Sequence, residues 1–180
     1  MLNYRLPTLD DYSVLYEYVA EHYSNGERSI SASIDLTKMK FEDWVKKINQ
    51  DAIIPSEKWG KHYLYLAFDN ERLIGLLSIR FDMPNNLKEL YGNIGYGVRP
   101  SERRKGYATQ MLKYALDICK EKNMNEVVLG CYDYNIASNK TIKKNGGILF
   151  KTDIQNKQLS DEWEIQLKDN FYKIKLNGDI

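Results

Sequence analysis

The fold of this chain is decided by one segment, VRPSERRKGYAT, which occupies residues 98–109. Its three adjacent cations, at 103–105, stand directly before residues 106–122, where apolar side chains recur on one helical face. Because the N-terminus of a helix carries partial positive charge, cations there are unfavourable unless an anion lies with them. Gly106 and Ala108 add little bulk, so a phosphate could reach the unpaired backbone N–H groups of the first turn. The segment predicts a pyrophosphate-binding turn, although the charges alone also fit a solvated basic turn.

The residues before this segment predict a short strand that leads into the turn. Residues 93–98 read NIGYGV, and glycine inside a strand is typical of a β-bulge or of the close approach of another backbone or a ligand. The turn lacks the G-x-x-x-x-G-K-[ST] pattern of a P-loop, and Gly95-Tyr96-Gly97 lacks the third glycine of a dinucleotide-binding fingerprint. We therefore expect a bulged strand, an anion-binding turn and a helix in direct succession.

Two blocks of this chain resemble a known family. Arg103-x-x-Gly106-x-Ala108 resembles the [RQ]-x-x-G-x-[GA] motif of the GNAT superfamily of acyl-CoA-dependent N-acetyltransferases. A second block, residues 135–147, is similar to the second CoA-contacting helix of that family, with a glycine in place of the usual aromatic residue after it. The blocks occur in the family's order with a strand between them, which is more specific than the first motif alone. The resemblance covers 91–150, is weaker elsewhere, and points to a bacterial subgroup.

The resemblance implies an α/β fold in a single domain, residues 1–180: a GNAT-like central mixed, largely antiparallel twisted sheet of about seven strands, flanked by about four helices and splayed between strands 4 and 5. Hydrophobic periodicity and turn residues agree with that order. We expect strands at 2–6, 62–68, 72–81, 93–98, 127–132, 148–154 and 171–176. We expect helices that start near residue 10, near residue 41, at residue 106 and at residue 135. The other segments are expected to be a polar loop at 24–35, an irregular link at 83–90 and an added hairpin within 155–170.

The resemblance also implies acetyl-CoA as the co-substrate, because in the GNAT fold it enters the gap between the splayed strands. Backbone groups of 96–98 would meet the thioester and the pantetheine arm, 103–109 would hold the pyrophosphate, and Asn135 and Ser138 would lie across the cleft. The residues expected to bind it are Tyr96, Gly97, Val98, Arg103, Arg104, Lys105, Gly106, Tyr107, Ala108, Thr109, Asn135 and Ser138. Asn135 also fits a simple helix N-cap, and Ser138 also fits an exposed position in a first helical turn.

The chemistry implied is direct attack of a primary amine on the thioester, with a base for the amine proton and an acid for the leaving thiolate. Family members often carry Glu or His at the positions of Gly92 and Ile94, and a tyrosine as acid at the position of Ile142. Neither proton-transfer group can therefore be carried over. The catalytic candidates are instead Glu89, Tyr91, Asp133 and Tyr134, with Tyr134 as the substitute acid. A water chain, or a packing or solvated role for each of these residues, is the alternative.

We therefore expect an acyl-CoA-dependent N-acetyltransferase that acts on a small-molecule or peptide amine. A non-catalytic acyl-CoA-binding or regulatory module is the alternative, and turnover would distinguish the two. The acceptor would contact 24–35 and 155–170, whose acidic residues could attract a cationic amine. A net charge of +1 and the lack of an interleaved basic–aromatic pattern argue against a nucleic-acid partner.

Composition predicts a cytoplasmic protein. No apolar run approaches the ~20 residues of a membrane span, and the first residues do not resemble a signal peptide. Cys119 and Cys131 lie on apolar faces without other ligands at metal-binding spacing, which indicates two reduced, packed thiols. We expect no metal and no membrane partner, and a homodimer is left open.

Overall fold

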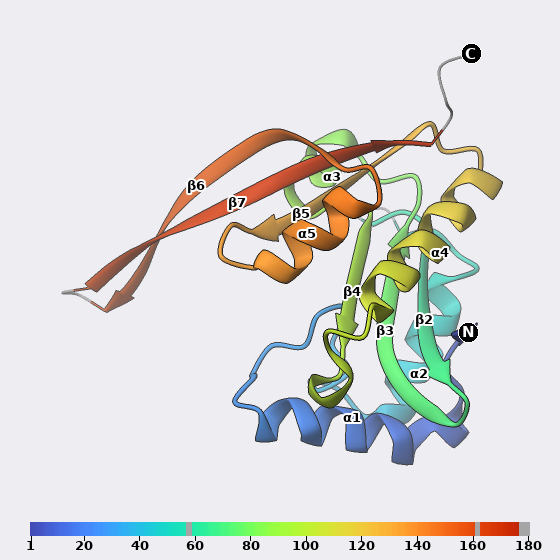
Figure 1. The fold of residues 1–180 in the computed structure, drawn as a ribbon. Helices are drawn as coiled ribbons and strands as arrows, with labels where there is room; N and C mark the ends of the chain where they lie inside the picture. The colour runs from blue at the N-terminus through green and yellow to red at the C-terminus, as the bar shows by residue number, and fades with distance from the viewer. Residues whose placement is uncertain (57–58, 161–162, 177–180) are drawn as a thin grey trace.

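The computed structural model describes residues 1–56, 59–160 and 163–176, without the side chains at 85–86, 89, 155–160 and 163–165. Within these residues the chain forms seven β-strands and five α-helices (Figure 1). The strands are β1 (Asn3–Arg5), β2 (His62–Asp69), β3 (Arg72–Arg80), β4 (Ile94–Val98), β5 (Glu126–Tyr132), β6 (Ile148–Ser160) and β7 (Trp163–Lys175). The helices are α1 (Tyr12–Ser24), α2 (Phe41–Asp51), α3 (Asn85–Tyr91), α4 (Tyr107–Glu121) and α5 (Ile136–Lys144). Across the described ranges, no helix has the length and apolar character that spanning a bilayer requires.

The strands form two antiparallel sheets that touch at one point and then diverge. The first sheet has the order β1-β2-β3-β4 and the second has the order β5-β7-β6. They are joined at Asn93, whose backbone N–H donates to the Val128 carbonyl at 2.7 Å and whose Oδ1 accepts from the Val128 N–H at 2.9 Å. Beyond this junction β5 runs away from β4 (Figure 1). The predicted largely antiparallel sheet, splayed between its fourth and fifth strands, is confirmed.

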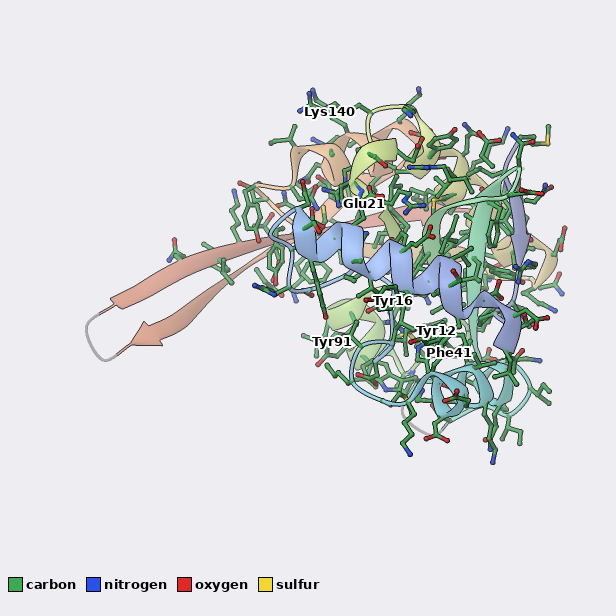
Figure 2. The ribbon with its side chains drawn as sticks, turned by 90° about the horizontal axis from the view of Figure 1, so that it is seen from below. Tyr12, Tyr16, Glu21, Phe41, Tyr91 and Lys140 are labelled. Atoms are coloured by element: carbon green, nitrogen blue, oxygen red, sulfur yellow. The ribbon has the colours of Figure 1, made fainter. Side chains whose placement is uncertain are left out.

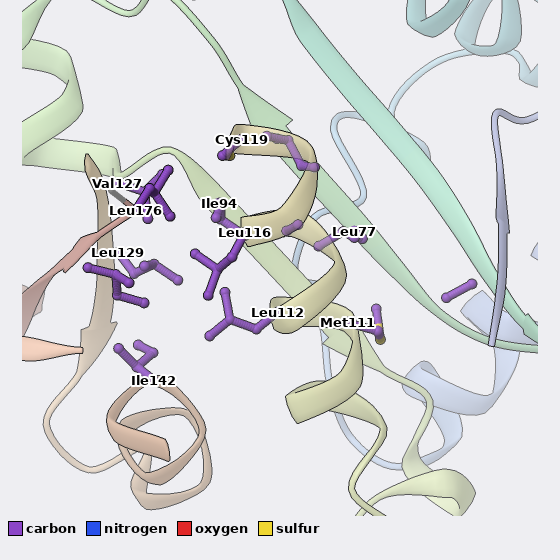
Figure 3. Packing of buried hydrophobic residues seen from close by; sticks show 14 of the residues in the cluster. Leu77, Ile94, Met111, Leu112, Leu116, Cys119, Val127, Leu129, Ile142 and Leu176 are labelled. Atoms are coloured by element: carbon purple, nitrogen blue, oxygen red, sulfur yellow. The ribbon is translucent and has the colours of Figure 1, made fainter. Parts of the chain in front are cut away.

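The predicted helices form and bury the faces that their apolar spacing indicates. α1 and α2 cover one face of the first sheet through Tyr18 and Trp44, both fully buried. α4 packs in the other core, where its Leu112 and Leu116 meet Ile142 of α5 between the two sheets (Figure 3). Because α4 and α5 share this core, their first turns are held on either side of the gap between β4 and β5.

Helix α1 is tied to its neighbours at both ends. Near its start, the ring of Tyr12 lies edge-on to Phe41 of α2 at 5.3 Å, and Figure 2 shows the two side by side. Near its end, Glu21 accepts a hydrogen bond from Arg99 at 2.8 Å and another from the Ser101 backbone N–H at 2.7 Å. The second contact fixes the chain between β4 and the turn that precedes α4.

Two details of the predicted strand–turn–helix region are corrected by the structure. The segment expected to be an irregular link contains α3. β4 pairs with β3 without a register shift, so the expected bulge is not there. The glycines instead permit close approach, since a Cβ at Gly97 would lie 2.8 Å from the Ser31 carbonyl oxygen. The second of the two explanations for glycine in this strand is therefore the correct one.

The last part of the chain also differs from the prediction. β6 and β7 form one long hairpin, paired from Ile148 with Lys173 to Ser160 with Trp163, that projects from the body of the protein (Figure 1). The residues expected to form a separate added hairpin at 155–170 are thus the outer part of the closing strands themselves. Residues 161–162, between the two strands in the sequence, lie outside the described residues.

Candidate functional site

A cleft of about 1170 Å³ lies where β4 and β5 diverge. Its walls are β4, the turn before α4, the end of β5 and the start of α5, with contributions from α3, β7 and the loop after α1. Every residue expected to bind the co-substrate lines this cleft except Lys105. The first sequence block, 98–109, and the first part of the second, 135–142, therefore meet at one cavity.

The turn before α4 presents a row of backbone donors. Gly106 caps the helix with a φ of 82°, a left-handed conformation in which glycine is unstrained. The N–H groups of residues 104–108 have no hydrogen-bond acceptor among the residues that the structure describes. A Cβ on Gly106 would meet no atom within 4 Å, so the space in front of the turn is open. Unpaired N–H groups at the positive end of a helix dipole suit an anion such as a diphosphate.

A second set of backbone donors comes from β4. The carbonyl of Asn93 and the N–H of Arg99 both bond to β3, which shows that the odd-numbered residues of this segment point toward that strand. In an antiparallel pair the N–H groups alternate in direction. Those of Ile94, Tyr96 and Val98 consequently point into the gap toward β5. The strand edge can thus hydrogen-bond an extended ligand that lies in the cleft.

The three cations of the turn are balanced differently from the prediction. Arg103 donates to both carboxylate oxygens of Glu27, one of them at 2.8 Å, and its Nε donates to the Val98 carbonyl at 3.0 Å. Lys105 pairs with Glu102 at 2.7 Å. Within the described part of the chain, only Arg104 of the three has no partner. The protein itself thus neutralises two of the charges that were expected to need an external anion.

Glu27 links the loop after α1 to this turn. Besides the Arg103 bonds, it lies 2.8 Å from His22 Nδ1 and accepts a bond from Asn25. The Arg103 bonds above all hold the pKa of Glu27 down at about 2. Burial lowers the pKa of His22, so this imidazole is neutral at pH 7 and its Nδ1–H can donate to the carboxylate. The network positions the loop over one end of the cleft.

Two hydroxyl groups meet across the cleft. The Tyr96 hydroxyl lies 3.0 Å from Ser138 Oγ, which joins β4 to the first turn of α5. Burial raises the pKa of Tyr96 to about 12, so its phenol stays protonated at neutral pH. Asn135 accepts a bond from the Ser138 backbone N–H at 3.0 Å, which confirms the predicted N-cap. We expected Tyr96 to contribute only its backbone. Ile94, Tyr96 and Val98 alternate along β4, so their side chains share one face of the strand, and this pattern could have shown that the Tyr96 side chain faces the core between α4 and α5.

Cys131 also lines the cleft but is a poor nucleophile. Burial raises the pKa of its thiol, with a hydrogen bond to Ser138 as a smaller opposing effect. A thiol with a raised pKa carries little thiolate at neutral pH. This agrees with direct transfer rather than with an acyl-cysteine step.

Of the four catalytic candidates, the described side chains place two at the cleft, Tyr91 and Tyr134. The ring of Tyr134 stacks on Tyr132 at 5.0 Å and lies at the cleft rim, 66% exposed. Tyr91 lines the cleft from α3 and is also exposed. Asp133 does not line the cleft and accepts a bond from Asn170 at 2.8 Å. Glu89 belongs to α3, but its side chain lies outside the described set.

Comparison with known proteins identifies the family. A family model described as the acetyltransferase (GNAT) family matches residues 32–146, more than half of the chain. Comparison with curated proteins gives no significant match.

Solved structures agree with the family model. The chain is similar to yncA of Salmonella typhimurium, solved with acetyl-CoA, at 13% identity and a TM-score of 0.69 over 99% of this chain and 95% of that one. It is similar to RimL, a ribosomal L7/L12 alpha-N-protein acetyltransferase solved with coenzyme A, at 20% identity and a TM-score of 0.71 over 99% and 96%. It is also similar to the microcin C7 self-immunity acetyltransferase MccE, at 19% identity and a TM-score of 0.68 over 97% and 92%. At these identities the likeness shows the fold, and together with the matching family model it establishes that the chain belongs to the acetyltransferase (GNAT) family.

Proposed function

We propose that this protein transfers the acetyl group of acetyl-CoA directly to the amine of a small molecule or peptide. The observation that carries the proposal is the row of unpaired N–H groups at 104–108, which opens onto the cleft between β4 and β5. A diphosphate at that row would leave the edge of β4 free to bind the pantetheine arm by its own N–H groups. That yncA was solved with acetyl-CoA and RimL with coenzyme A supports the same assignment.

The first contribution of the cleft to the reaction is to position the amine and the thioester. Holding an amine and a thioester side by side removes much of the entropic cost of their encounter. The β4 N–H groups that point into the gap, at Tyr96 and Val98, would stabilise negative charge that develops on the thioester oxygen. Acetyl-CoA supplies an activated acyl group, and the chain supplies orientation and these donors.

Proton supply to the leaving thiolate is assigned to Ser138. Its hydroxyl lies beside that of Tyr96, so Ser138 can take a proton from Tyr96 as it gives its own to the thiolate, and water then returns a proton to Tyr96. Burial raises the pKa of Tyr96, which keeps the phenol protonated before the reaction. A positioned acid of this kind contributes about 100-fold or more to a rate. We assign the amine proton to water, because two of the carboxylates that line the cleft, Glu27 and Glu102, are held in ion pairs and the third, Asp169, is assigned below to binding the acceptor.

The experiment is an assay of thiol release from acetyl-CoA in the presence of polyamines, aminoglycosides, amino acids, simple amines and peptides. The proposal predicts release above the buffer rate with at least one class, and an acetylated product 42 Da heavier than its parent by mass spectrometry. Tight acetyl-CoA binding without turnover on any class would favour the acyl-CoA-binding module instead.

A further inference from the structure

The second sheet has two faces, and only one of them meets α5. On β7, Tyr172 and Asn170 face α5, because both bond to Asn139 of that helix. The alternate residues Phe171 and Asp169 therefore face the opposite side, toward α3. The ring of Phe171 confirms this direction, because it covers the space that a side chain at Gly130 of β5 would occupy.

The acceptor amine must enter the cleft from this opposite side, and this inference rests on the proposed function. The groups assigned to acetyl-CoA belong to β4 and to α4 and α5, two helices that share one core on the α5-facing side of the second sheet. A nucleophile that attacks the thioester must approach from the side that these elements leave open. That side is lined by α3, the loop after α1 and the outward face of β5 and β7.

Among the described residues that line the cleft, one unpaired carboxylate stands on this acceptor side. Glu27 is already neutralised by Arg103. Asp169 lines the cleft and has no hydrogen bond or ion pair among the described residues. Burial, with a smaller contribution from Asp153, raises the pKa of Asp169. A carboxylate that is partly desolvated and unpaired gains more from a bound cation than one in open water.

The surroundings of Asp169 are aromatic. Tyr132 lies directly opposite it in the strand register, and Phe171 is the next residue of β7 on the same face. The ring of Tyr134 stacks on Tyr132 and extends this wall. Ring faces attract cations and accept flat or apolar groups.

We propose that Asp169 binds the ammonium of the acceptor, and that the acceptors are cationic primary amines with an aromatic or apolar substituent and no carboxylate beside the amine. A carboxylate on the acceptor would be placed close to Asp169 and would be repelled. Asp169 is thus a substrate-binding residue that sets specificity.

The test compares acceptors that differ only in a carboxylate: tyramine with tyrosine, and phenethylamine with phenylalanine. For the wild-type protein we expect kcat/KM to be at least about 10-fold higher for the two amines. Asp169→Asn should lower kcat/KM for tyramine by about 10- to 100-fold and remove most of the discrimination. The KM for acetyl-CoA should not change.

The matched control is Asp153→Asn, which removes a carboxylate on the neighbouring strand that is already paired with Lys151 at 2.7 Å. It should retain the preference for tyramine. Equal rates with tyramine and tyrosine in the wild type, or no acetylation of either amine, would overturn the inference even if another acceptor is used. Absence of acetyl-CoA binding in calorimetry would instead reject the proposed function, so the two failures are separable.

Discussion

The hydroxyl groups of Tyr96 and Ser138 lie 3.0 Å apart and connect β4 to α5 across the cleft. Tyr96 lies on β4, and Ser138 lies on the helix that follows β5, so the pair spans the two strands that diverge from the Asn93 junction. Their contact places a hydroxyl pair in the cleft. The position of the family's usual acid is occupied by Ile142, which is buried in the core, so the pair supplies a chemical group that the sequence motif lacks.

Replacing Ser138 with Ala is expected to lower kcat by about 100-fold, because the leaving thiolate would lose its positioned acid. The affinity for acetyl-CoA should stay within about 2-fold, since the diphosphate and pantetheine donors are backbone groups. Tyr96→Phe should show a smaller loss of kcat, because it removes the hydroxyl that returns a proton to Ser138 but leaves the Ser138 hydroxyl in place. Steady-state rates at saturating acetyl-CoA, with calorimetry for affinity, check both. A Ser138→Ala protein with unchanged kcat would contradict the assignment.

Tyr134 is the competing proton donor, because its phenol lies at the rim of the same cleft. If Ser138 is the acid, Tyr134→Phe should lower kcat by less than about 3-fold, well below the loss in Ser138→Ala. The two variants are compared in one assay with the same acceptor. A larger loss in Tyr134→Phe would return the role to Tyr134, as the sequence alone suggested.

The Glu27–Arg103 pair makes stability depend on pH in a defined direction. The pKa of Glu27 falls from 4.5 to about 2 in the folded protein. A lowered pKa means that the stabilisation is complete above the unfolded-state value and is lost as pH falls toward 2. Glu27→Gln should therefore reduce the free energy of unfolding by about 1 kcal/mol at pH 7 and by less than half as much at pH 3.

Urea unfolding of Glu27→Gln at both pH values checks this prediction. Glu17→Gln is the matched control, because Glu17 is exposed on α1 and has no ion pair among the described residues. An effect of Glu27→Gln that is as large at pH 3 as at pH 7 would show that the pair is not the cause.

Asn93 is expected to hold the two sheets together. Asn93→Ala removes the acceptor of the buried Val128 N–H and the donor to the Arg80 carbonyl. Leaving one such buried group unpaired costs about 2 kcal/mol. Chemical denaturation should show a loss of that size in the free energy of unfolding. A loss under about 0.5 kcal/mol would mean that the junction is held by packing alone.

Much of the site could be predicted because its signals are local. The turn at 98–109 and the N-cap at Asn135 each need only a few consecutive residues. The apolar faces of α1, α2 and α4 likewise follow from spacing along one helix. Contacts between residues that are far apart in the sequence could not be predicted from such local signals. Glu27 lies 76 residues from Arg103, and the Tyr96 and Ser138 hydroxyls are 42 residues apart.

Two elements escaped the sequence reading for other physical reasons. α3 has only seven residues, too few for a helical repeat to stand out from a loop. The outer part of the β6–β7 hairpin projects from the body, so neither face of residues 155–160 and 163–165 must be apolar. The alternation that reveals a strand arises from burial of one face, and it is absent from residues that project in this way.

The central claim is that the turn before α4 binds the diphosphate of acetyl-CoA, and calorimetry of one matched pair of variants tests it most directly. Gly106→Val and Gly146→Val both force a branched residue into a left-handed conformation, with φ of 82° and 87°, and both point into open space, but only Gly106 lines the cleft. Each should lose about 1–2 kcal/mol of stability from this strain. The account predicts that Gly106→Val, shown to be folded by its circular dichroism spectrum, binds acetyl-CoA about 100-fold more weakly than the wild type. Gly146→Val should bind acetyl-CoA as the wild type does. Unchanged acetyl-CoA affinity in folded Gly106→Val would contradict it.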